Sequence, residues 1–341
     1  MPLVSIIIIA EKWNPFLEES LPKYQDLDYP NFETLVFLTK SKNGIARNSL
    51  PVSRQGHCPN LSFYYNPELI NNPAQKRDLA IKYAKGEIFA FIDDDAFPSK
   101  DWLKEAVKNF DDPSVVAVGG PGITPIDASI FEKSSGWVSA SPMGGFGSTY
   151  RFISSKRRFV DDYPSFNLLV RKDAFIKIGG FDSNFYPGED TKLCLELTRG
   201  HISKIVYDPK AFVYHHKRPL FKKHLIQNGR YGLHRGHFAR ILPTTSRRWF
   251  YFIPSLFSFG LLFGVLSLPL NFKLGKFGLL GGLGTYGVLL LMNSLWVLVK
   301  SGSSVIALLT IPGVFLTHFW YGIQFLRGFF TKKMHDTYGR A

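Results

Sequence analysis

Short apolar runs alternate with amphipathic segments along the first two hundred residues of the chain. The runs are rich in β-branched and aromatic side chains, which is typical of buried strands. Between several of them, apolar residues recur three or four positions apart, which predicts helices. Strands are therefore expected at residues 4–9, 34–38, 61–65, 88–92, 115–118, 166–170, 202–207 and 211–214, and helices from residue 15 and at 74–85, 102–107, 172–178 and 191–198.

This order of elements predicts an α/β fold. Strands that alternate with helices form a mostly parallel sheet, because each helix carries the chain back across one face of the sheet. Two polar stretches with several glycines interrupt the pattern, at residues 39–60 and 134–158, and both are expected to be loops. The second loop either moves over a binding site or is a plain surface loop.

The last quarter of the chain is different in character. Three apolar segments, at residues 250–270, 277–299 and 303–326, contain no Asp, Glu, Lys or Arg. Each is long enough to cross a hydrocarbon core of about 30 Å, so the sequence predicts a multi-pass protein of the cell membrane. If all three segments cross, the tail at 327–341 lies opposite the N-terminal domain; if the first lies in the interface, the tail returns to the same side. Both topologies remain open.

The charge of the chain calls for an anionic partner. Its 41 Lys and Arg residues outnumber its 27 Asp and Glu residues, which gives a net charge of +14. Much of the excess lies at residues 217–249, directly before the first apolar segment. Basic residues in this position mark the cytoplasmic side of a membrane with anionic lipids. We do not expect nucleic acid as a partner, because no nucleic-acid-binding module is recognisable.

The cysteines and the N-terminus also indicate that the N-terminal domain is cytoplasmic. Cys58 and Cys194 lie far apart and lack metal-ligand spacing, which favours a reducing compartment. The apolar run at 4–9 is too short for a signal peptide and has no basic segment before it.

Three adjacent carboxylates, Asp93, Asp94 and Asp95, follow the apolar run at 88–92. A buried parallel strand that ends in acidic residues delivers them to the edge where open α/β sheets bind ligands. Adjacent carboxylates repel one another unless a cation or hydrogen-bond donors neutralise them. Mg²⁺ and Mn²⁺ take oxygen ligands and bridge carboxylates to phosphates, so the triplet predicts a metal–diphosphate site. The alternative is an acidic turn in contact with solvent.

Other residues carry candidate chemistry as well. Glu189 and Asp190 stand at the start of an expected helix, where the simplest interpretation is that they cap its positive end. Lys76 and Arg77 lie on another expected helix, and in the simplest interpretation they form a solvated face. Five histidines match no compact set of metal ligands, and we interpret them as a titratable surface near lipid: His215, His216, His224, His234 and His237.

Taken together, these motifs resemble family 2 glycosyltransferases with the GT-A fold, a Rossmann-like sheet with flanking helices. The run at 4–9 is similar to the first strand of that family, and residues 86–98 look like its Gly-Glu…Asp-x-Asp segment. Residues 167–182 resemble the strand and turn before its catalytic helix, and residues 188–190 resemble its Glu-Asp motif.

The resemblance covers about residues 3–216, and the order and spacing of several motifs make it specific. Beyond it, residues 227–231 look like a variant of the Gln-x-x-Arg-Trp motif of the membrane-bound synthases in this family. Gln227 and Arg230 match that motif, and Tyr231 stands in place of Trp.

The resemblance implies roles for individual residues. Asp95 would ligate a divalent metal, Mn²⁺ or Mg²⁺, on the diphosphate of a nucleotide-sugar donor, and Asp93 would face the nucleoside or the metal. Asp190 would be the general base of an inverting transfer, which needs one base on the acceptor hydroxyl. Adjacent carboxylates cannot be ranked from sequence, so Glu189 is the alternative base.

Further contacts follow from the same resemblance. Donor binding is expected to involve Asp94, Lys76, Arg77 and Arg230, since arginine geometry suits a diphosphate. Arg230 has a competing interpretation as a lipid-headgroup contact. Gln227 and Tyr231 would lie near the diphosphate or the acceptor.

The chain departs from the family in two places. The second strand ends in residues 37–40, Phe-Leu-Thr-Lys, where the family has Asp residues that contact the nucleobase. The first strand ends in residues 9–11, Ile-Ala-Glu, rather than in Pro. Base recognition therefore differs here, or Glu11 supplies a contact to the donor.

We therefore expect an inverting, metal-dependent glycosyltransferase of the hexosyltransferase type. It would move a sugar from a nucleotide diphosphate to a lipid-linked or polysaccharide acceptor in cell-surface glycan synthesis. Transfer to a polyprenyl phosphate is the alternative, and a non-catalytic membrane scaffold is the rival from another class. The expected domains are a GT-A domain at 1–216, a basic amphipathic linker at 217–249, a membrane domain of two or three helices at 250–326 and a basic tail at 327–341.

Overall fold

The computed structural model describes residues 1–39, 60–65, 72–183, 185–200, 202–269, 273–332 and 334. Most of the loop expected at 39–60 and most of the basic tail lie outside these residues. The chain forms two compact units, one of Met1–Ile123 and Ser154–His215, the other of Thr124–Ile153 with the chain from His216 to Met334. The functional domain boundaries expected from the sequence stay a prediction.

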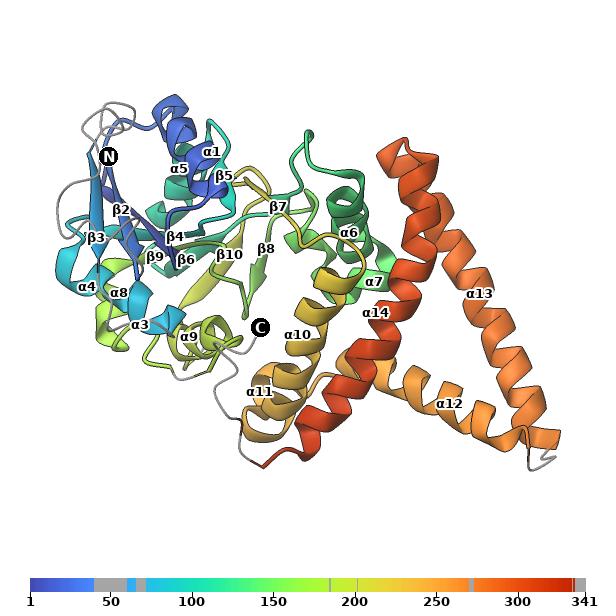
Figure 1. Ribbon diagram of the computed structural model, residues 1–341. Helices are drawn as coiled ribbons and strands as arrows, with labels where there is room; N and C mark the ends of the chain where they lie inside the picture. The colour runs from blue at the N-terminus through green and yellow to red at the C-terminus, as the bar shows by residue number, and fades with distance from the viewer. Residues whose placement is uncertain are drawn as a thin grey trace. The chain divides into compact units, whose positions relative to one another are not determined.

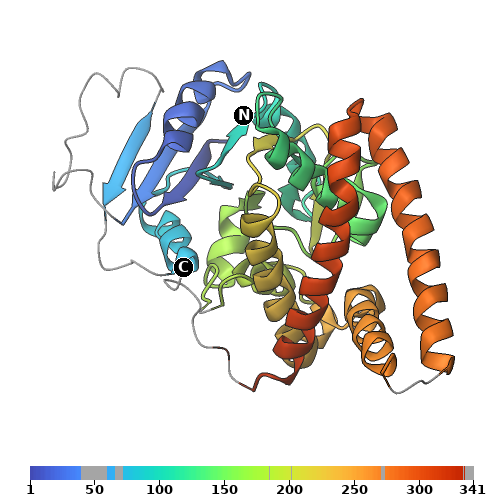
Figure 2. The ribbon, with the colours of Figure 1, turned by 45° about the vertical axis from the view of Figure 1, so that its right-hand side comes forward.

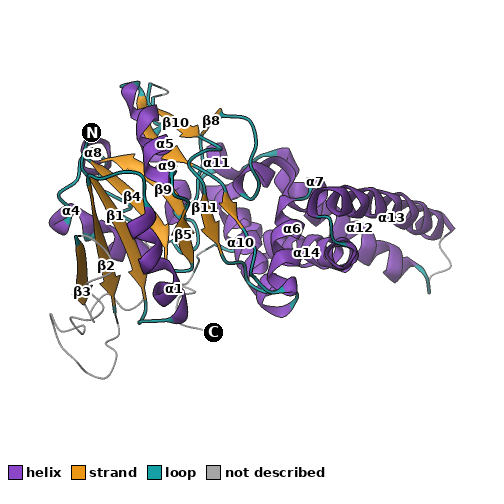
Figure 3. Cartoon of the chain, turned by 90° about the horizontal axis from the view of Figure 1, so that it is seen from above, coloured by secondary structure: helices purple, strands orange, loops and turns teal. Residues whose placement is uncertain are grey.

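An eight-stranded sheet forms the centre of the first unit, in the order β3-β2-β1-β4-β9-β6-β10-β8 (Figure 3). Six of these strands run in one direction, and β9 and β8 run against them, so the sheet is mostly parallel. Their bounds are β1 (Val4–Ala10), β2 (Phe32–Leu38), β3 (Leu61–Tyr65), β4 (Ile88–Asp93), β6 (Val115–Gly119), β8 (Arg158–Val160), β9 (Asn167–Arg171) and β10 (Lys204–Tyr207).

Helices of the first unit accompany the sheet at the expected places (Figure 1). Asn14 caps the first of them by accepting from Leu17 N, and Asn72 caps α3 in the same way, each with a proline at the first helical position. The single helix expected at 74–85 is two short ones, α3 and α4. The bounds are α1 (Pro15–Lys23), η1 (Tyr24–Asp26), α3 (Pro73–Asp78), α4 (Ala80–Tyr83), α5 (Trp102–Val107), η3 (Lys108–Asp111), α8 (Lys172–Lys177) and α9 (Glu189–Leu197).

A second, three-stranded sheet in the same unit has the order β5-β11-β7. It consists of β5 (Ala96–Pro98), β11 (Val213–His215) and β7 (Gly122–Ile123). β5 pairs antiparallel with β11 so that Ala96 lies opposite His215. This pairing places His215 beside the turn from β4 to β5, next to the three carboxylates.

The second unit is helical. Its elements are α6 (Ile130–Ala140), α7 (Pro142–Gly145), η4 (Phe146–Arg151), α10 (Lys222–Ile241), α11 (Pro243–Ser246), η5 (Trp249–Phe252), α12 (Ile253–Ser267), α13 (Lys273–Ser301) and α14 (Ser304–Phe330). Three stretches are long and apolar enough to cross a membrane: Trp249–Ser267, Phe277–Ser301 and Ser304–Phe330. The expected α/β fold with C-terminal apolar helices is confirmed.

Two expectations about the second unit are wrong. Most of the first part of the loop expected at 134–158 is helical instead: residues 134–140 belong to α6, residues 142–145 form α7 and residues 146–151 form η4. α6 begins with a capping box between Ser129 and Glu132. The histidines of α10 are not a surface: His224, His234 and His237 are buried, and burial lowers the pKa of His224 and of His234 to about 4. On α10, Gly229, Gly232 and Gly236 allow α14 to approach closely, a use of glycine that composition alone does not reveal.

Candidate active site

The carboxylate triplet lies at the carboxyl end of β4 and in the turn to β5. Asp95 is 6% exposed, Asp93 is half-buried, and Asp94 Oδ2 accepts a 2.6 Å hydrogen bond from Asn14 Nδ2. The alternative of an acidic turn simply in contact with solvent therefore does not describe Asp95. The strand that precedes the triplet is fully buried, which fixes where these side chains emerge.

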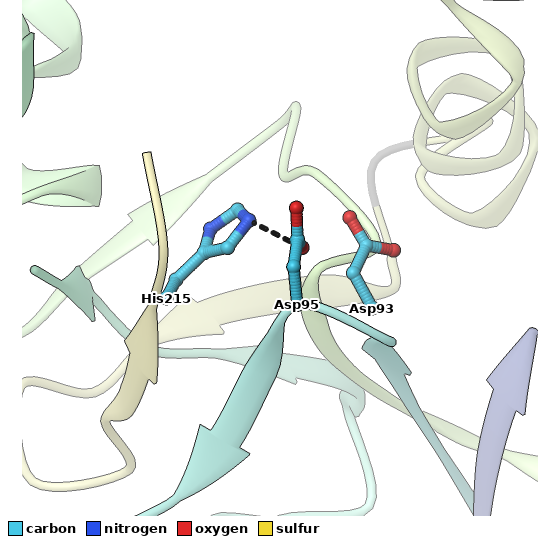
Figure 4. Close-up of side chains that lie close together, drawn as sticks. All are labelled: Asp93, Asp95 and His215. Carbon is cyan, nitrogen blue, oxygen red and sulfur yellow. Dashed lines mark ion pairs between the residues drawn. The ribbon is translucent and has the colours of Figure 1, made fainter. Parts of the chain in front are cut away.

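His215 joins two of these carboxylates. Its Nε2 lies 3.1 Å from Asp95 Oδ1 (Figure 4). The centre of its ring lies 4.7 Å from that of Phe166. One ligand atom from each of Asp93, Asp95 and His215 lies within 4.8 Å of the others. The interpretation of His215 as a lipid-facing surface residue is wrong, because strand pairing brings it to the triplet. No sequence spacing signals such a contact.

This group of three fits a divalent metal ion. Adjacent ligands about 2.1 Å from a metal lie about 3 Å apart, which matches the 3.1 Å between His215 Nε2 and Asp95 Oδ1. Two carboxylate oxygens suit Mg²⁺ and Mn²⁺, and an imidazole nitrogen favours a transition metal such as Mn²⁺. The residues present therefore agree with a divalent ion at this place.

Arg77 connects the triplet to the Glu-Asp pair. Its guanidinium donates from Nη2 to Asp93 Oδ1 at 2.9 Å and from Nη1 to Glu189 Oε1 at 2.8 Å. It is 5% exposed and lies 5.5 Å from the ring centre of Phe181. A buried guanidinium between two carboxylates neutralises both and holds them in fixed positions.

Lys76, the neighbour of Arg77, is also buried. Its Nζ donates to Thr39 Oγ1 at 3.3 Å. The Thr39 hydroxyl in turn donates to the backbone oxygen of Glu11 at 3.0 Å, which ties together the ends of β1 and β2. The solvated-face interpretation of Lys76 and Arg77 is wrong, since both side chains are buried. Their contacts with a donor, and that of the exposed Glu11, stay predictions.

Glu189 and Asp190 begin α9 and differ in their surroundings. Glu189 is buried and uses both oxygens, Oε1 with Arg77 and Oε2 as the acceptor for Gly188 N at 3.0 Å. Burial raises the pKa of the Glu189 carboxyl. Asp190 Oδ1 accepts from Thr191 N at 2.8 Å, and Oδ2 has no hydrogen-bond partner within the described part of the chain.

The charge around Asp190 suits a proton acceptor. Burial, followed by the charges of Glu189 and Asp162, raises the pKa of Asp190 to about 7. Asp162 itself accepts from Thr191 Oγ1 at 3.1 Å. A carboxyl that titrates near neutrality gains or loses a proton easily under physiological conditions.

The remaining candidates lie on α10, in the second unit. Gln227 and Arg230 are half-buried, and Tyr231 is exposed. Their contacts with a diphosphate or an acceptor stay predictions.

Asn167 is a buried residue whose tethering role was missed from sequence. Its Nδ2 donates to the backbone oxygens of Gly120 and Ala211 at 2.7 and 2.8 Å, and its Oδ1 accepts from Trp102 Nε1 at 2.8 Å. It therefore ties β9 to the chain segments that lead into β7 and β11. Since β11 ends at His215, Asn167 supports the position of that histidine.

The fold and the site define a glycosyltransferase. Residues 5–179, more than half of the chain, match the family described as Glycosyl transferase family 2, and the chain belongs to this family. The solved structure of the mannosyltransferase PcManGT from Pyrobaculum calidifontis, in complex with GDP-Man and Mn²⁺, has the same fold. It matches with a TM-score of 0.54 and 18% identity, over 97% of this chain and 88% of that one.

Two curated relatives are enzymes named for dolichyl-linked substrates. The dolichyl N-acetyl-α-D-glucosaminyl phosphate 3-β-D-2,3-diacetamido-2,3-dideoxy-β-D-glucuronosyltransferase of Methanococcus voltae is 25% identical over 338 residues, 96% of this chain and 97% of the relative. The glucosyl-dolichyl phosphate glucuronosyltransferase of Haloferax volcanii is 26% identical over 141 residues, 38% of this chain and 43% of the relative.

Proposed function

We propose that this glycosyltransferase moves a sugar from a nucleotide-diphosphate donor to a sugar carried on a polyprenyl-type lipid at the cytoplasmic face of the cell membrane. The observation that carries the proposal is a row of neighbouring groups. His215 contacts Asp95, Asp93 lies within 4.8 Å of both, and Arg77 pairs with Asp93 and with Glu189, the sequence neighbour of Asp190. A metal-ligand set and a carboxyl of near-neutral pKa lie in one continuous polar cluster. The names of the two relatives support a lipid-linked acceptor.

Asp93, Asp95 and His215 would hold the divalent metal, with Mn²⁺ favoured over Mg²⁺ by the imidazole ligand. A metal bound there would neutralise the charge that develops on the leaving diphosphate. Arg77 keeps Asp93 in place through its ion pair, so the ligand set is ordered before the donor arrives.

Asp190 is the better candidate for the general base. Both carboxylate oxygens of Glu189 already accept hydrogen bonds, one from Arg77 and one from Gly188 N. A general base needs an oxygen that is available to the hydroxyl of the sugar acceptor. Asp190 keeps Oδ2 for that role, and its pKa of about 7 balances proton affinity against ionisation at neutral pH. One base on the acceptor and one departing diphosphate describe a single displacement, which inverts the anomeric centre.

A transfer assay with the full-length protein in detergent tests the proposal. UDP-, GDP- and dTDP-sugars are each offered with Mn²⁺, together with either a polyprenyl phosphate or a polyprenyl-phosphate-linked sugar. We expect one donor to be consumed, only with metal and only with the sugar-bearing lipid. Consumption with the unsubstituted polyprenyl phosphate would assign the alternative acceptor, and transfer to neither lipid would refute the proposal.

A further inference from the structure

The three apolar helices of the second unit use their side chains differently. The difference is seen in the share of residues that is buried in the most apolar stretch of each segment. This share is 28% in the segment that contains α12 and 22% in α13, but it reaches 44% in α14. The large apolar side chains that α14 exposes along its 27 residues are Val305, Leu308, Trp320 and Phe330. α13 exposes ten such side chains: Phe277, Leu280, Leu283, Val288, Leu289, Leu291, Met292, Leu295, Leu298 and Val299. The apolar residues of α14 are therefore largely used inside the protein.

The C-terminal half of α14 packs closely on α10, and the two helices lie side by side in Figures 1 and 2. A Cβ at Gly236 would lie 2.0 Å from the backbone oxygen of Phe325, and a Cβ at Gly328 would lie 1.8 Å from that of Leu233. The two backbones therefore touch without side chains between them. Lipid has no room along this face.

The N-terminal half of α14 is covered by α6 and α7 on one side and by the C-terminal half of α13 on another, where Val297 packs against Ile306 and Ala307. A Cβ at Gly313 would lie 2.7 Å from the side chain of Val138. His318 Nε2 lies 2.9 Å from the backbone oxygen of Met143, to which it donates. The helix thus has protein against it along its length.

The helix that covers the C-terminal half of α14 does not fit inside a bilayer. α10 carries five Lys and Arg residues and no acidic residue: Lys222, Lys223, Arg230, Arg235 and Arg240. Charged side chains are costly in hydrocarbon, and basic residues collect at the cytoplasmic surface instead. Because α10 and the C-terminal half of α14 are in backbone contact, that half of α14 shares the level of α10 relative to the membrane. A Cβ at Gly322, in the same half, would lie 2.1 Å from the backbone oxygen of Pro254, so α12 begins at this level too.

The end of α14 also meets the end of α10. Arg240 Nη2 donates to the backbone oxygens of Thr331 and of Lys332, the latter at 3.0 Å. All three apolar helices lie between Arg240 and Thr331 in the sequence. Two contacting points lie on one side of a membrane, so the chain between them crosses an even number of times.

We propose that α12 and α13 form a hairpin that enters the bilayer and returns to the side from which it came, while α14 stays outside the hydrocarbon on α6 and α10. The exposed α12–α13 surface would contact the acyl chains, and Figure 1 shows the C-terminal end of α12 and the N-terminal end of α13 lying away from α14. The 19 residues from Trp249 to Ser267 measure about 28 Å and the 29 residues of α13 about 43 Å, against a core of about 30 Å. Exposed Trp249 begins the hairpin, where interfacial tryptophans are common.

The proposal assigns Lys332 to the same side as α10, and it does not rest on the proposed function. Single cysteines test it at three exposed positions: Ser304→Cys and Lys332→Cys at the two ends of α14, and Lys223→Cys on α10 as the reference. Each cysteine is introduced into a protein that already carries Cys58→Ser. The native Cys194 can stay, because it is fully buried and offers no accessible thiol. A membrane-impermeant maleimide is added to sealed spheroplasts of an expressing bacterium and again after permeabilisation.

The maleimide should modify all three cysteines under the same condition, either all in sealed spheroplasts or all only after permeabilisation. Opposite patterns for Ser304→Cys and Lys332→Cys would mean that α14 crosses the membrane, which overturns the proposal. A second measurement needs no substitution: a diazirine that partitions into the acyl chains should label peptides of α12 and α13 in proteoliposomes and spare α14. Labelling of α14 to the same extent as α13 would also overturn it.

Discussion

The imidazole Nε2 of His215 lies 3.1 Å from Oδ1 of Asp95, although one residue ends β11 and the other follows β4. The antiparallel pairing of β5 with β11 produces this contact. It places an imidazole nitrogen beside two carboxylates, and it gives the proposed metal site a member that can be tested separately from the triplet.

His215→Ala should weaken Mn²⁺ binding by at least about tenfold, because an imidazole ligand is lost from a site with few protein ligands. The electron paramagnetic resonance signal of free Mn²⁺ in a titration measures the affinity directly. His216→Ala is the matched control, since the neighbouring imidazole lies 3.4 Å from Glu132 in the second unit instead. Equal affinities in both variants would remove His215 from the ligand set.

Asp190→Asn should lower the turnover of sugar transfer by about 10²- to 10⁴-fold, because the amide cannot accept the proton of the acceptor hydroxyl. Mn²⁺ and nucleotide affinities should stay unchanged, since the metal-ligand cluster is intact. Asp26→Asn, at an exposed position of η1, controls for the loss of one negative charge. Turnover close to that of the unaltered enzyme would rule out Asp190 as the base.

Activity should depend on pH through Asp190. Its folded-state pKa of about 7 lies above the ordinary value of 3.8, so the base is ionised and active only above about pH 7. The same shift means that the folded protein binds this proton more tightly than the unfolded chain, and its stabilising effect is lost as pH rises through 7. We expect kcat/KM to rise towards a plateau above pH 7, and Asp190→Asn to raise the melting temperature relative to the unaltered protein there. A flat profile between pH 6 and 8 would contradict the assignment.

Arg77→Met should destabilise the protein by about 3–5 kcal/mol, because Glu189 would be left buried without its cation. Adding Glu189→Gln should recover part of that loss, since a neutral amide costs less to bury than an unpaired carboxylate. Thermal unfolding in detergent measures both changes. Lys82→Met on the neighbouring helix removes an exposed cation and is expected to have little effect.

Gly236→Ala should destabilise the second unit by about 1–3 kcal/mol, because its methyl group has no room against the backbone of Phe325. Gly281→Ala on α13 is the control, since no atom lies within 4 Å of a Cβ placed there. The melting temperatures of the two variants in detergent give the comparison. If Gly236→Ala unfolds no earlier than Gly281→Ala, the close contact of α10 and α14 is not required.

Much of the fold could be predicted because its signals are local. Continuous apolar runs mark β1 and β4, and Asn14 followed by Pro15 marks the start of α1 through a cap and a preset φ angle. The position of the carboxylate triplet follows from the strand before it. The family resemblance added the Glu-Asp pair.

Tertiary structure decided the rest. The sequence placed His215 outside the proposed metal site and left a choice between a solvated and a phosphate-binding Arg77, because ring-to-carboxylate and guanidinium-to-carboxylate contacts depend on how distant strands and helices meet. It predicted three apolar segments but not which of their side chains face another helix, because hydropathy does not distinguish apolar residues that face lipid from those that pack inside the protein. Local composition determines which elements form; pairing between distant segments determines which side chains meet and which surfaces remain for the membrane.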